Sequence, residues 1–116
     1  MWVKSTDSRA PVLGDFEQLV LFGVLRLGSD AFGAAIRQEI HERSGRDVSI
    51  NAVYTTLDRL EGKRLLRSSV GDPTPERGGR RRKFYALTPA GTAALKQAYR
   101  SITAMAKGYE SALSTR

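Results

Sequence analysis

The residues with the clearest chemical capacity form a dense cluster of cations in the second half of the chain. From Arg59 to Lys83 there are nine Lys or Arg residues and three carboxylates, a balance of +6 out of the chain's formal +7. Such a concentrated basic patch is the electrostatic signature of a protein that binds nucleic acid. The alternative is a solvated loop or a targeting tract. A free basic loop, however, would not need the strand-forming run KFYAL at its end, so this run favours a contact role. We expect phosphate contacts, with an arginine entering a minor groove, from Arg77, Arg80, Arg81, Arg82 and Lys83.

A second set of chemical groups lies on one face of the helix expected after Ser49. Apolar residues at helical spacing, from Ile50 to Leu60, form the inward stripe of this helix. The opposite face is short, polar and rich in hydrogen-bonding groups, whereas a face built only for water more often carries long Glu and Lys side chains. This composition favours contact with a partner over a purely solvated face. The candidate contact residues are Ser49, Asn51, Tyr54, Thr55, Asp58 and Arg59.

Each side chain on this face has an expected role in a DNA major groove, where every base pair presents a distinct donor and acceptor pattern. Asn51 and Thr55 are expected to read base edges. The hydroxyls of Tyr54 and Ser49 are expected to reach phosphates. Asp58 would repel phosphate, so it either accepts a hydrogen bond from a cytosine amine or orients the neighbouring arginine.

The sequence offers little for catalysis. It has no cysteine, and its one histidine, His41, stands beside Glu42 and Arg43 with no nucleophile to activate. It contains neither a phosphate-binding Walker loop nor metal-ligand spacing. We therefore predict that the chain is not an enzyme and holds no metal and no cofactor. With 116 residues, no apolar run long enough to cross a bilayer and no hydrophobic leader in MWVKSTDSRAPV, a single-domain cytoplasmic protein is expected.

The first elements that position these groups are a loose polar arm, residues 1–12, and an amphipathic helix. Asp15 is the expected N-cap of this helix, because its carboxylate can accept from the amide N–H three residues on. The helix runs to about Leu27 and has one apolar stripe at helical spacing. Apolar residues on a second side need a second cover, which is either another copy of the chain or its own last helix. These residues are Leu21, Phe22 and Leu25.

A helix-turn-helix pattern follows. A second helix is expected from about Phe32 to Arg43, and Gly45 suits the left-handed position just past its end. Ser49 is a good N-cap for the third helix. Two helices joined by a tight turn that contains glycine are typical of this motif.

A β-hairpin is expected after the third helix. Residues 65–70 and 84–87 read as its strands, separated by Gly- and Pro-rich residues. Period-two alternation directs Tyr85 and Leu87 toward the core. The predicted fold class is therefore mainly α with a small β-hairpin, as a winged helix-turn-helix domain over residues 13–88.

A long C-terminal helix is expected to complete the chain over residues 89–116. Thr88 is its N-cap, and Pro89 takes the first helical position, where its missing N–H costs nothing. Its apolar residues recur at steps of three and four, as in the seam of a coiled coil, which predicts a dimerisation helix. The predicted interface of two copies consists of Leu21, Phe22, Leu25, Leu95, Ala98, Ile102, Met105, Tyr109 and Leu113.

Taken together, the sequence resembles the PadR family of bacterial winged-helix transcriptional regulators. The resemblance is carried by LGDFEQLVLFGVL (13–25), AVYTTLDRLEGKRLL (52–66) and RGGRRRKFYALTPAG (77–91). It implies a homodimer joined through the first and last helices, with two recognition helices facing DNA. It also implies repression of nearby genes, relieved in some members by a small ligand. The tail is similar to that of the short form with one C-terminal helix, and Tyr54 and residues 80–83 match the family's DNA-contacting positions.

Two residues depart from the family pattern. The family usually places glycine just before the leucine that opens the first strand of the hairpin; Arg64 stands there, and the glycine comes earlier, at Gly62. Either the helix stops at Gly62 or Arg64 adopts a positive φ, which is uncommon outside glycine. Phe32 replaces a common tyrosine and removes one hydroxyl.

The function predicted from these features is sequence-specific binding of double-stranded DNA by a homodimeric regulator, most simply a repressor at a pseudo-palindromic operator. A small-molecule effector is implied by the resemblance alone. A winged-helix module that docks an acidic protein partner is the alternative. An RNA-binding module is a third possibility, for which Tyr54 and Phe84 are the residues available to stack on bases.

Overall fold

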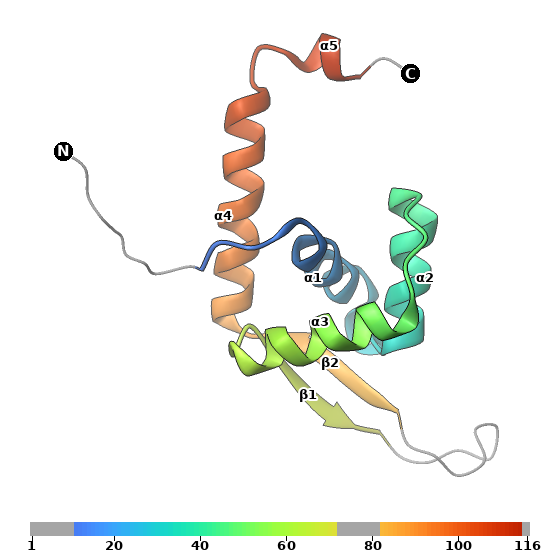
Figure 1. The fold of residues 1–116 in the computed structure, drawn as a ribbon. Coiled ribbons are helices and arrows are strands. Elements are labelled where there is room, and N and C mark those ends of the chain that lie inside the picture. Colours follow the sequence, from blue (N-terminus) through green and yellow to red (C-terminus); the bar gives the residue numbers. More distant parts are fainter. Residues whose placement is uncertain (1–10, 72–81, 115–116) are drawn as a thin grey trace.

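Three short helices and one β-hairpin form the body of the protein, and a long helix rises away from it (Figure 1). The computed structural model describes residues 11–71 and 82–114, so Arg77, Arg80, Arg81 and most of the predicted arm lie outside the described residues. The predicted fold class, mainly α with a small hairpin, is confirmed. The elements are α1 (Asp15–Leu27), η1 (Gly28–Asp30), α2 (Gly33–Ser44), α3 (Ile50–Gly62), β1 (Leu66–Val70), β2 (Lys83–Leu87), α4 (Pro89–Ala106) and α5 (Glu110–Leu113).

The hydrophobic core lies where α1, α2 and α3 meet, and it is closed by the hairpin and the first half of α4. Ile36 and Leu57 are fully buried there. Leu21, predicted at a subunit interface, is also fully buried, because α1 packs on β2 and α4 as well as on α2 and α3. Leu95 is covered in the same way and is 5% exposed. The prediction of Leu21 and Leu95 as interface residues is therefore wrong, since this chain already covers both.

The start of α1 also differs from the prediction. Gly14, not Asp15, is the N-cap, and its carbonyl accepts the hydrogen bond from the amide of Gln18 at 3.0 Å. The amide of Gly14 donates in turn to Oε1 of Glu17 at 2.9 Å. Because Glu17 stands at the third helical position, its carboxylate can fold back onto the cap, which the carboxylate of Asp15 at the first position does not do.

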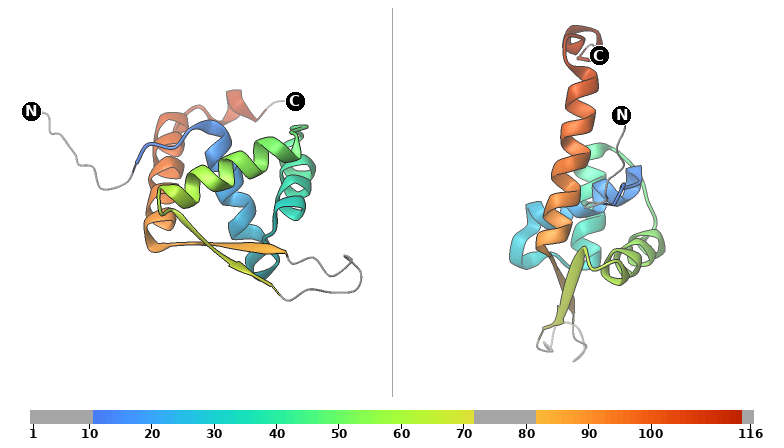
Figure 2. Two further views of the ribbon diagram at one scale, coloured as in Figure 1. Left: turned by 60° about the horizontal axis from the view of Figure 1, so that its bottom comes forward. Right: turned by 90° about the vertical axis from the view of Figure 1, so that its left-hand side faces the viewer.

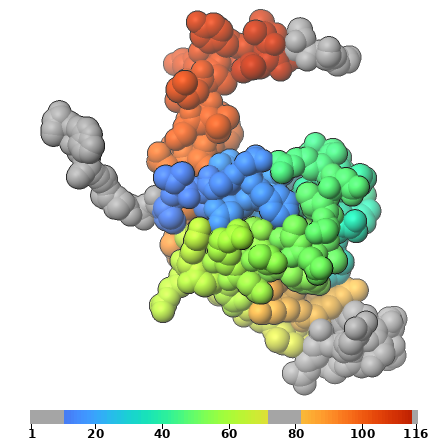
Figure 3. Space-filling model, in the orientation of Figure 1, coloured from blue at the N-terminus to red at the C-terminus, as the bar shows by residue number. Residues whose placement is uncertain are grey.

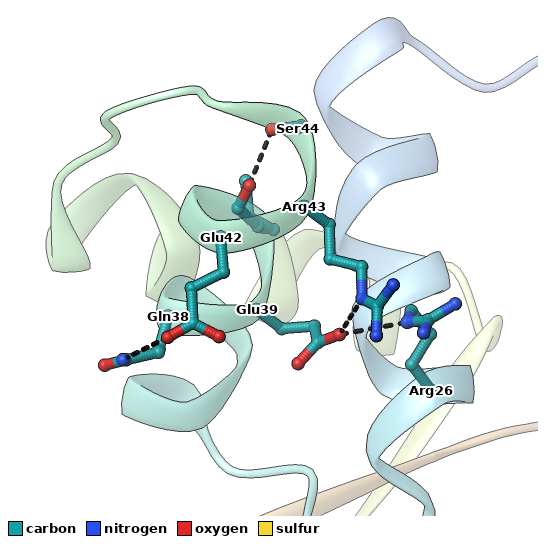
Figure 4. A network of polar contacts seen from close by, with 7 residues as sticks. Arg26, Gln38, Glu39, Glu42, Arg43 and Ser44 are labelled. Atoms are coloured by element: carbon teal, nitrogen blue, oxygen red, sulfur yellow. Dashed lines mark hydrogen bonds and ion pairs between the residues drawn. The ribbon is translucent and has the colours of Figure 1, made fainter.

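An ion-pair cluster joins α1 to α2 (Figure 4). Oε2 of Glu39 on α2 accepts from Arg26 of α1 and from Arg43, one turn further along α2, each at 2.9 Å. These hydrogen bonds, Arg43 first and then Arg26, lower the pKa of Glu39 below its ordinary value. Both arginine side chains are largely exposed, so these ion pairs contribute little to stability.

The turn between α2 and α3 follows the sequence prediction. Gly45 has φ 77°, the left-handed conformation for which glycine is suited, and its amide donates to the carbonyl of His41. The hydroxyl of Ser49 accepts from the amide of Ala52 at 3.0 Å, as an N-cap should. Helix α2 begins at Gly33, one residue later than predicted, because Phe32 is extended and pairs with Phe84.

The end of α3 shows how the chain accommodates an arginine at position 64, where the family usually has glycine. Helix α3 ends at Gly62, and Arg64 adopts φ 65°. Its amide donates to Glu61, and the amide of Leu65 donates to the carbonyl of Leu60 at 3.0 Å. This pair of bonds is the Schellman termination, in which glycine usually takes the left-handed position. An arginine here accepts backbone strain in order to aim Leu65 and the first strand into the core.

The hairpin is a two-stranded antiparallel sheet in which Leu66 pairs with Leu87 and Val70 with Lys83. Tyr85 is buried, as predicted, and Leu87 is half-buried against the core. The far edge of β2 is also covered, since the amide of Tyr85 donates to the carbonyl of Ala31 at 2.8 Å. The wing is thus fastened to the segment between η1 and α2.

Helix α4 stands clear of the body over its second half (Figure 2). Thr88 caps it, accepting from the amide of Gly91 at 3.0 Å, as predicted. The long helix expected from residue 89 onward is not continuous: α4 ends at Ala106, Gly108 takes φ 90°, and α5 starts at Glu110. The left-handed glycine interrupts the helical hydrogen bonds and turns the chain. Within residues 11–71 and 82–114, no helix has the length and apolar character that spanning a bilayer requires.

Candidate nucleic-acid interface

Helix α3 lies across the front of the molecule, directly above the hairpin (Figure 3). Asn51, Thr55 and Asp58 are exposed, and Tyr54 is 45% exposed. The predicted inward stripe holds, with Val53, Leu57 and Leu60 fully buried and Ile50 half-buried. The stripe therefore fixes the helix and leaves three short polar side chains and one phenol facing outward.

Two residues of this face have structural partners within the chain. The hydroxyl of Ser49 is used as the N-cap of α3, so it serves the helix itself. The ring of Tyr54 lies against Gly33, the first residue of α2, where no side chain stands in its way. Tyr54 is thereby held between the two helices of the helix-turn-helix unit, with its outer part exposed.

The cations at the C-terminal end of α3 are held by a carboxylate from α1. Oε2 of Glu17 accepts from Nζ of Lys63 at 3.0 Å and lies 3.8 Å from Nη1 of Arg59. Burial raises the pKa of Glu17, but hydrogen bonds from Gly14 and Lys63, with the charges of Lys63 and Arg59, outweigh burial and leave the pKa below its ordinary value. Arg59, predicted as a DNA contact, is thus an ion-pair partner of Glu17 that keeps half of its side chain exposed.

A second carboxylate joins α3 to the wing. Oε1 of Glu61 lies 3.4 Å from Nζ of Lys83 on β2, and Oε2 accepts from the hydroxyl of Ser68 on β1 at 2.5 Å. The Ser68 hydrogen bond, followed by the charge of Lys83, lowers the pKa of Glu61. Lys83 therefore carries a structural contact, and it fixes the wing at the C-terminal end of α3.

Arg82 is held in another way. Its guanidinium carbon lies 3.9 Å from the centroid of the Phe32 ring, and this ring meets the ring of Phe84 edge to face. Two of the described wing cations therefore contact the helix-turn-helix unit: Lys83 at the end of α3, and Arg82 at the residue that precedes α2. The remaining predicted wing cations, Arg77, Arg80 and Arg81, lie outside the described residues.

Three residues of the site were not among the predicted contacts: Glu17, Phe32 and Glu61. A Glu at the third position of a helix is a sequence signal for capping, but its contact with Lys63 joins residues 46 positions apart. Phe32 and Arg82 are also far apart in the sequence, by fifty residues, but their side chains pack together. Local spacing carries no information on such pairs.

A separate apolar groove lies between α1 and α4. It has a volume of about 320 Å³, and its lining is apolar apart from the ends of three side chains. Its members are Phe22, Leu25, Leu87, Thr92, Leu95, Lys96 and Tyr99. Among the described residues, no group of three or more His, Cys, Asp or Glu side chains is placed to hold a metal ion.

Comparisons with known proteins bear on this geometry. The sequence model of a family described as the transcriptional regulator PadR-like family matches residues 21–97. The transcriptional regulator Rv3488 of Mycobacterium tuberculosis is 40% identical over 81 residues, which are 68% of this chain and 69% of that protein. Two crystal structures of PadR family regulators are also similar. One, from Eggerthella lenta DSM 2243, has a TM-score of 0.63 and 25% identity, with 85% of this chain and 84% of that chain covered. The other, from Clostridium difficile R20291, has a TM-score of 0.58 and 29% identity, with 79% and 96% covered.

Proposed function

Since this chain belongs to the PadR-like family of transcriptional regulators, we propose that it binds a specific DNA operator, with α3 in the major groove and the hairpin on the phosphate backbone. The observation that carries this proposal is the joint placement of two surfaces. The short polar face of α3 is exposed, and the cationic wing is fastened to the end of the same helix by Glu61 and Lys83. One rigid unit therefore presents a base-reading face and a phosphate-binding face together.

The two surfaces have different roles in the proposed DNA binding. Asn51 and Thr55 read base edges, because their side chains are short, exposed and able to donate and accept. Tyr54 reaches a phosphate with its outer edge, and Asp58 accepts from a cytosine amine. The wing arginines, Arg82 and the three that precede it, bind phosphates and carry no sequence information.

We further propose that two copies assemble through residues 89–116 with help from α1. Several large apolar side chains on the outer part of α4 and on α5 lie in solvent, and Met105 is 83% exposed. An apolar stripe of this length is costly to leave uncovered in a soluble chain. Two copies joined there would aim two α3 helices at half-sites about one helical turn, 10–10.5 bp, apart or a multiple of that. The exposed or half-buried residues available are Phe22, Leu25, Ala98, Ile102, Met105, Tyr109 and Leu113.

We propose repression as the mode of regulation and the groove between α1 and α4 as the place for an effector that lifts it. The groove is formed by the same two helices that would join the copies, so a ligand there could change how far apart the α3 helices lie. Its apolar lining suits an apolar or aromatic molecule. A screen of such molecules by thermal shift, with Leu25→Glu as the blocked control, tests this site; stabilisation that Leu25→Glu leaves intact counts against it.

Fluorescence anisotropy on the intergenic DNA that flanks the gene, with a random duplex of equal length, tests the proposed function. Replacing Arg80, Arg81 and Arg82 with Gln is expected to weaken binding to both duplexes alike and to flatten the salt dependence by about one unit per lost phosphate contact. Asn51→Ala or Thr55→Ala should weaken only the specific duplex, by about 1–3 kcal/mol for each lost base contact. Equal losses on both duplexes for both sets of variants would contradict this assignment, and capture of an acidic protein without DNA binding would favour protein docking.

A further inference from the structure

Arg82 is supported by an aromatic ring that is itself firmly fixed. The guanidinium carbon lies 3.9 Å from the centroid of Phe32, well inside the distance of about 6 Å at which a cation and a ring face attract. The Phe32 ring meets Phe84 at 5.7 Å with an interplanar angle of 75°, and the two residues also pair through their backbones. The hydrogen bond from Tyr85 to Ala31 ties the same segment to β2.

Three other described cations around α3 are held by carboxylates instead. Glu17 holds Lys63 and Arg59, and Glu61 holds Lys83. An ion pair fixes a cation but also cancels part of the charge that the cation could offer to a phosphate. A ring face fixes a guanidinium without cancelling its charge, and it leaves the N–H donors at the rim of the guanidinium available.

Arg82 is therefore a cation of the wing that is held in place without an ion pair to a described carboxylate. Among the described residues, no carboxylate forms an ion pair with it. An arginine without support loses rotamer freedom when it binds a phosphate, and this loss weakens the contact. A support that orders the side chain beforehand removes most of that cost.

We infer that Phe32 is a positioning residue for DNA binding, whose ring holds the Arg82 guanidinium ready for a backbone phosphate. This inference rests on the proposed function, and Phe32 need not touch the DNA. The ring would act through Arg82 alone, so its contribution should be independent of DNA sequence. It also gives the wing a fixed distance from the start of α2, because Phe32 is the residue that caps that helix.

The stacking itself can be tested without DNA. In the full-length protein, the ring current of Phe32 should move the Nε–H proton resonance of Arg82 upfield from its ordinary position. Phe32→Tyr keeps the ring face and should keep this displacement, whereas Phe32→Leu keeps an apolar side chain and should abolish it. An Arg82 resonance at the same position in the wild type and in Phe32→Leu would overturn the inference.

The consequence for binding is tested with a double-mutant cycle on the intergenic duplex and on a random duplex. Phe32→Leu should weaken binding about three- to tenfold on both, and Phe32→Tyr should stay within about twofold of the wild type. Arg82→Gln should weaken binding and reduce the salt slope. In the Arg82→Gln background, Phe32→Leu should have no further effect, because the residue it positions is gone.

The outcomes distinguish failure of the Phe32 inference from failure of the proposed function. An equal loss from Phe32→Leu in the wild-type and Arg82→Gln backgrounds would show a general structural role and overturn the inference. Full-strength binding by Phe32→Leu would overturn it too, while leaving the proposed function in place. A wild-type protein that binds neither duplex would overturn the proposed function itself. Thermal unfolding of each variant, followed by circular dichroism, keeps loss of fold from being mistaken for loss of contact.

Discussion

The ring of Tyr54 occupies the space in which a side chain on Gly33 would stand. A Cβ added to Gly33 would lie 2.3 Å from Cε1 of Tyr54 and 2.8 Å from its hydroxyl oxygen. The first residue of α2 and an outward residue of α3 are therefore matched in size. This close fit sets the angle at which Tyr54 leaves the helix-turn-helix unit, and hence the direction of its hydroxyl.

The close fit predicts that Gly33→Ala changes stability in opposite directions in the wild type and in the Tyr54→Ala variant. In the wild type, Gly33→Ala should lower the free energy of unfolding by about 1–2 kcal/mol, because the new methyl group must displace the ring. In the Tyr54→Ala background the clash is absent, so Gly33→Ala should stabilise by about 0.5 kcal/mol through helix propensity. Urea unfolding of the four proteins measures both values. The same cost in both backgrounds would show that the clash is not with Tyr54.

From the geometry at the end of α3, we predict that Arg64→Gly and Gly62→Ala each stabilise the protein. Arg64→Gly should stabilise by about 1 kcal/mol, because glycine takes the left-handed φ of 65° without strain. Gly62→Ala should add up to about 1 kcal/mol, because Gly62 is helical and an added Cβ meets nothing within 4 Å. Denaturant midpoints of the single and double variants test this.

Gly45→Ala is the control for the stability change expected of Arg64→Gly. Gly45 has φ 77° and no atom near its added Cβ, so alanine there would meet strain without crowding. It should destabilise by about 1 kcal/mol, opposite in sign to Arg64→Gly. Stabilisation by Gly45→Ala, or destabilisation by Arg64→Gly, would contradict the role assigned to positive φ.

We expect the contribution of Glu17 to the stability of the folded protein to depend on pH. Its folded pKa is lowered, so the ionised carboxylate contributes stability above its unfolded pKa, and this contribution is lost as pH falls through the folded pKa. Glu17→Gln should cost about 1–2 kcal/mol at pH 7, because the hydrogen bond to Lys63 loses its charge. The difference from the wild type should shrink at pH values below 4.5, the ordinary pKa of a glutamate. Unfolding curves at pH 7 and pH 3 measure it, and a gap that widens in acid would refute the pairing.

The outer stripe of α4 predicts which substitution separates the two copies. Ile102 is 62% exposed, and Ile102→Glu should weaken self-association at least about tenfold, because it places a charge in an apolar interface. Ala104→Glu is the matched control, since Ala104 is also exposed but lies about 200° around the helix. Sedimentation equilibrium measures both. A wild-type monomer, or equal effects from the two variants, would argue against this interface.

The sequence by itself determined the elements whose cause is local. The caps Ser49 and Thr88, the left-handed Gly45 and the strands around Tyr85 depend on hydrogen bonds and side-chain alternation within a few residues, so a reading of neighbours suffices. The concentration of positive charge was equally plain, because it is a property of composition. The family pattern even marked Arg64 as the point where the backbone would be unusual.

Only the tertiary structure decided which groups meet. Leu21 and Leu95 are buried within one chain because α1 packs on its own hairpin and α4, whereas the apolar pattern of α1 left the second cover open between the last helix and another copy. The pairing of Glu17 with Lys63, and of Phe32 with Arg82, joins residues far apart in the sequence. Spacing along a chain fixes the direction of a side chain from its own helix or strand; packing of those elements against one another fixes what it faces.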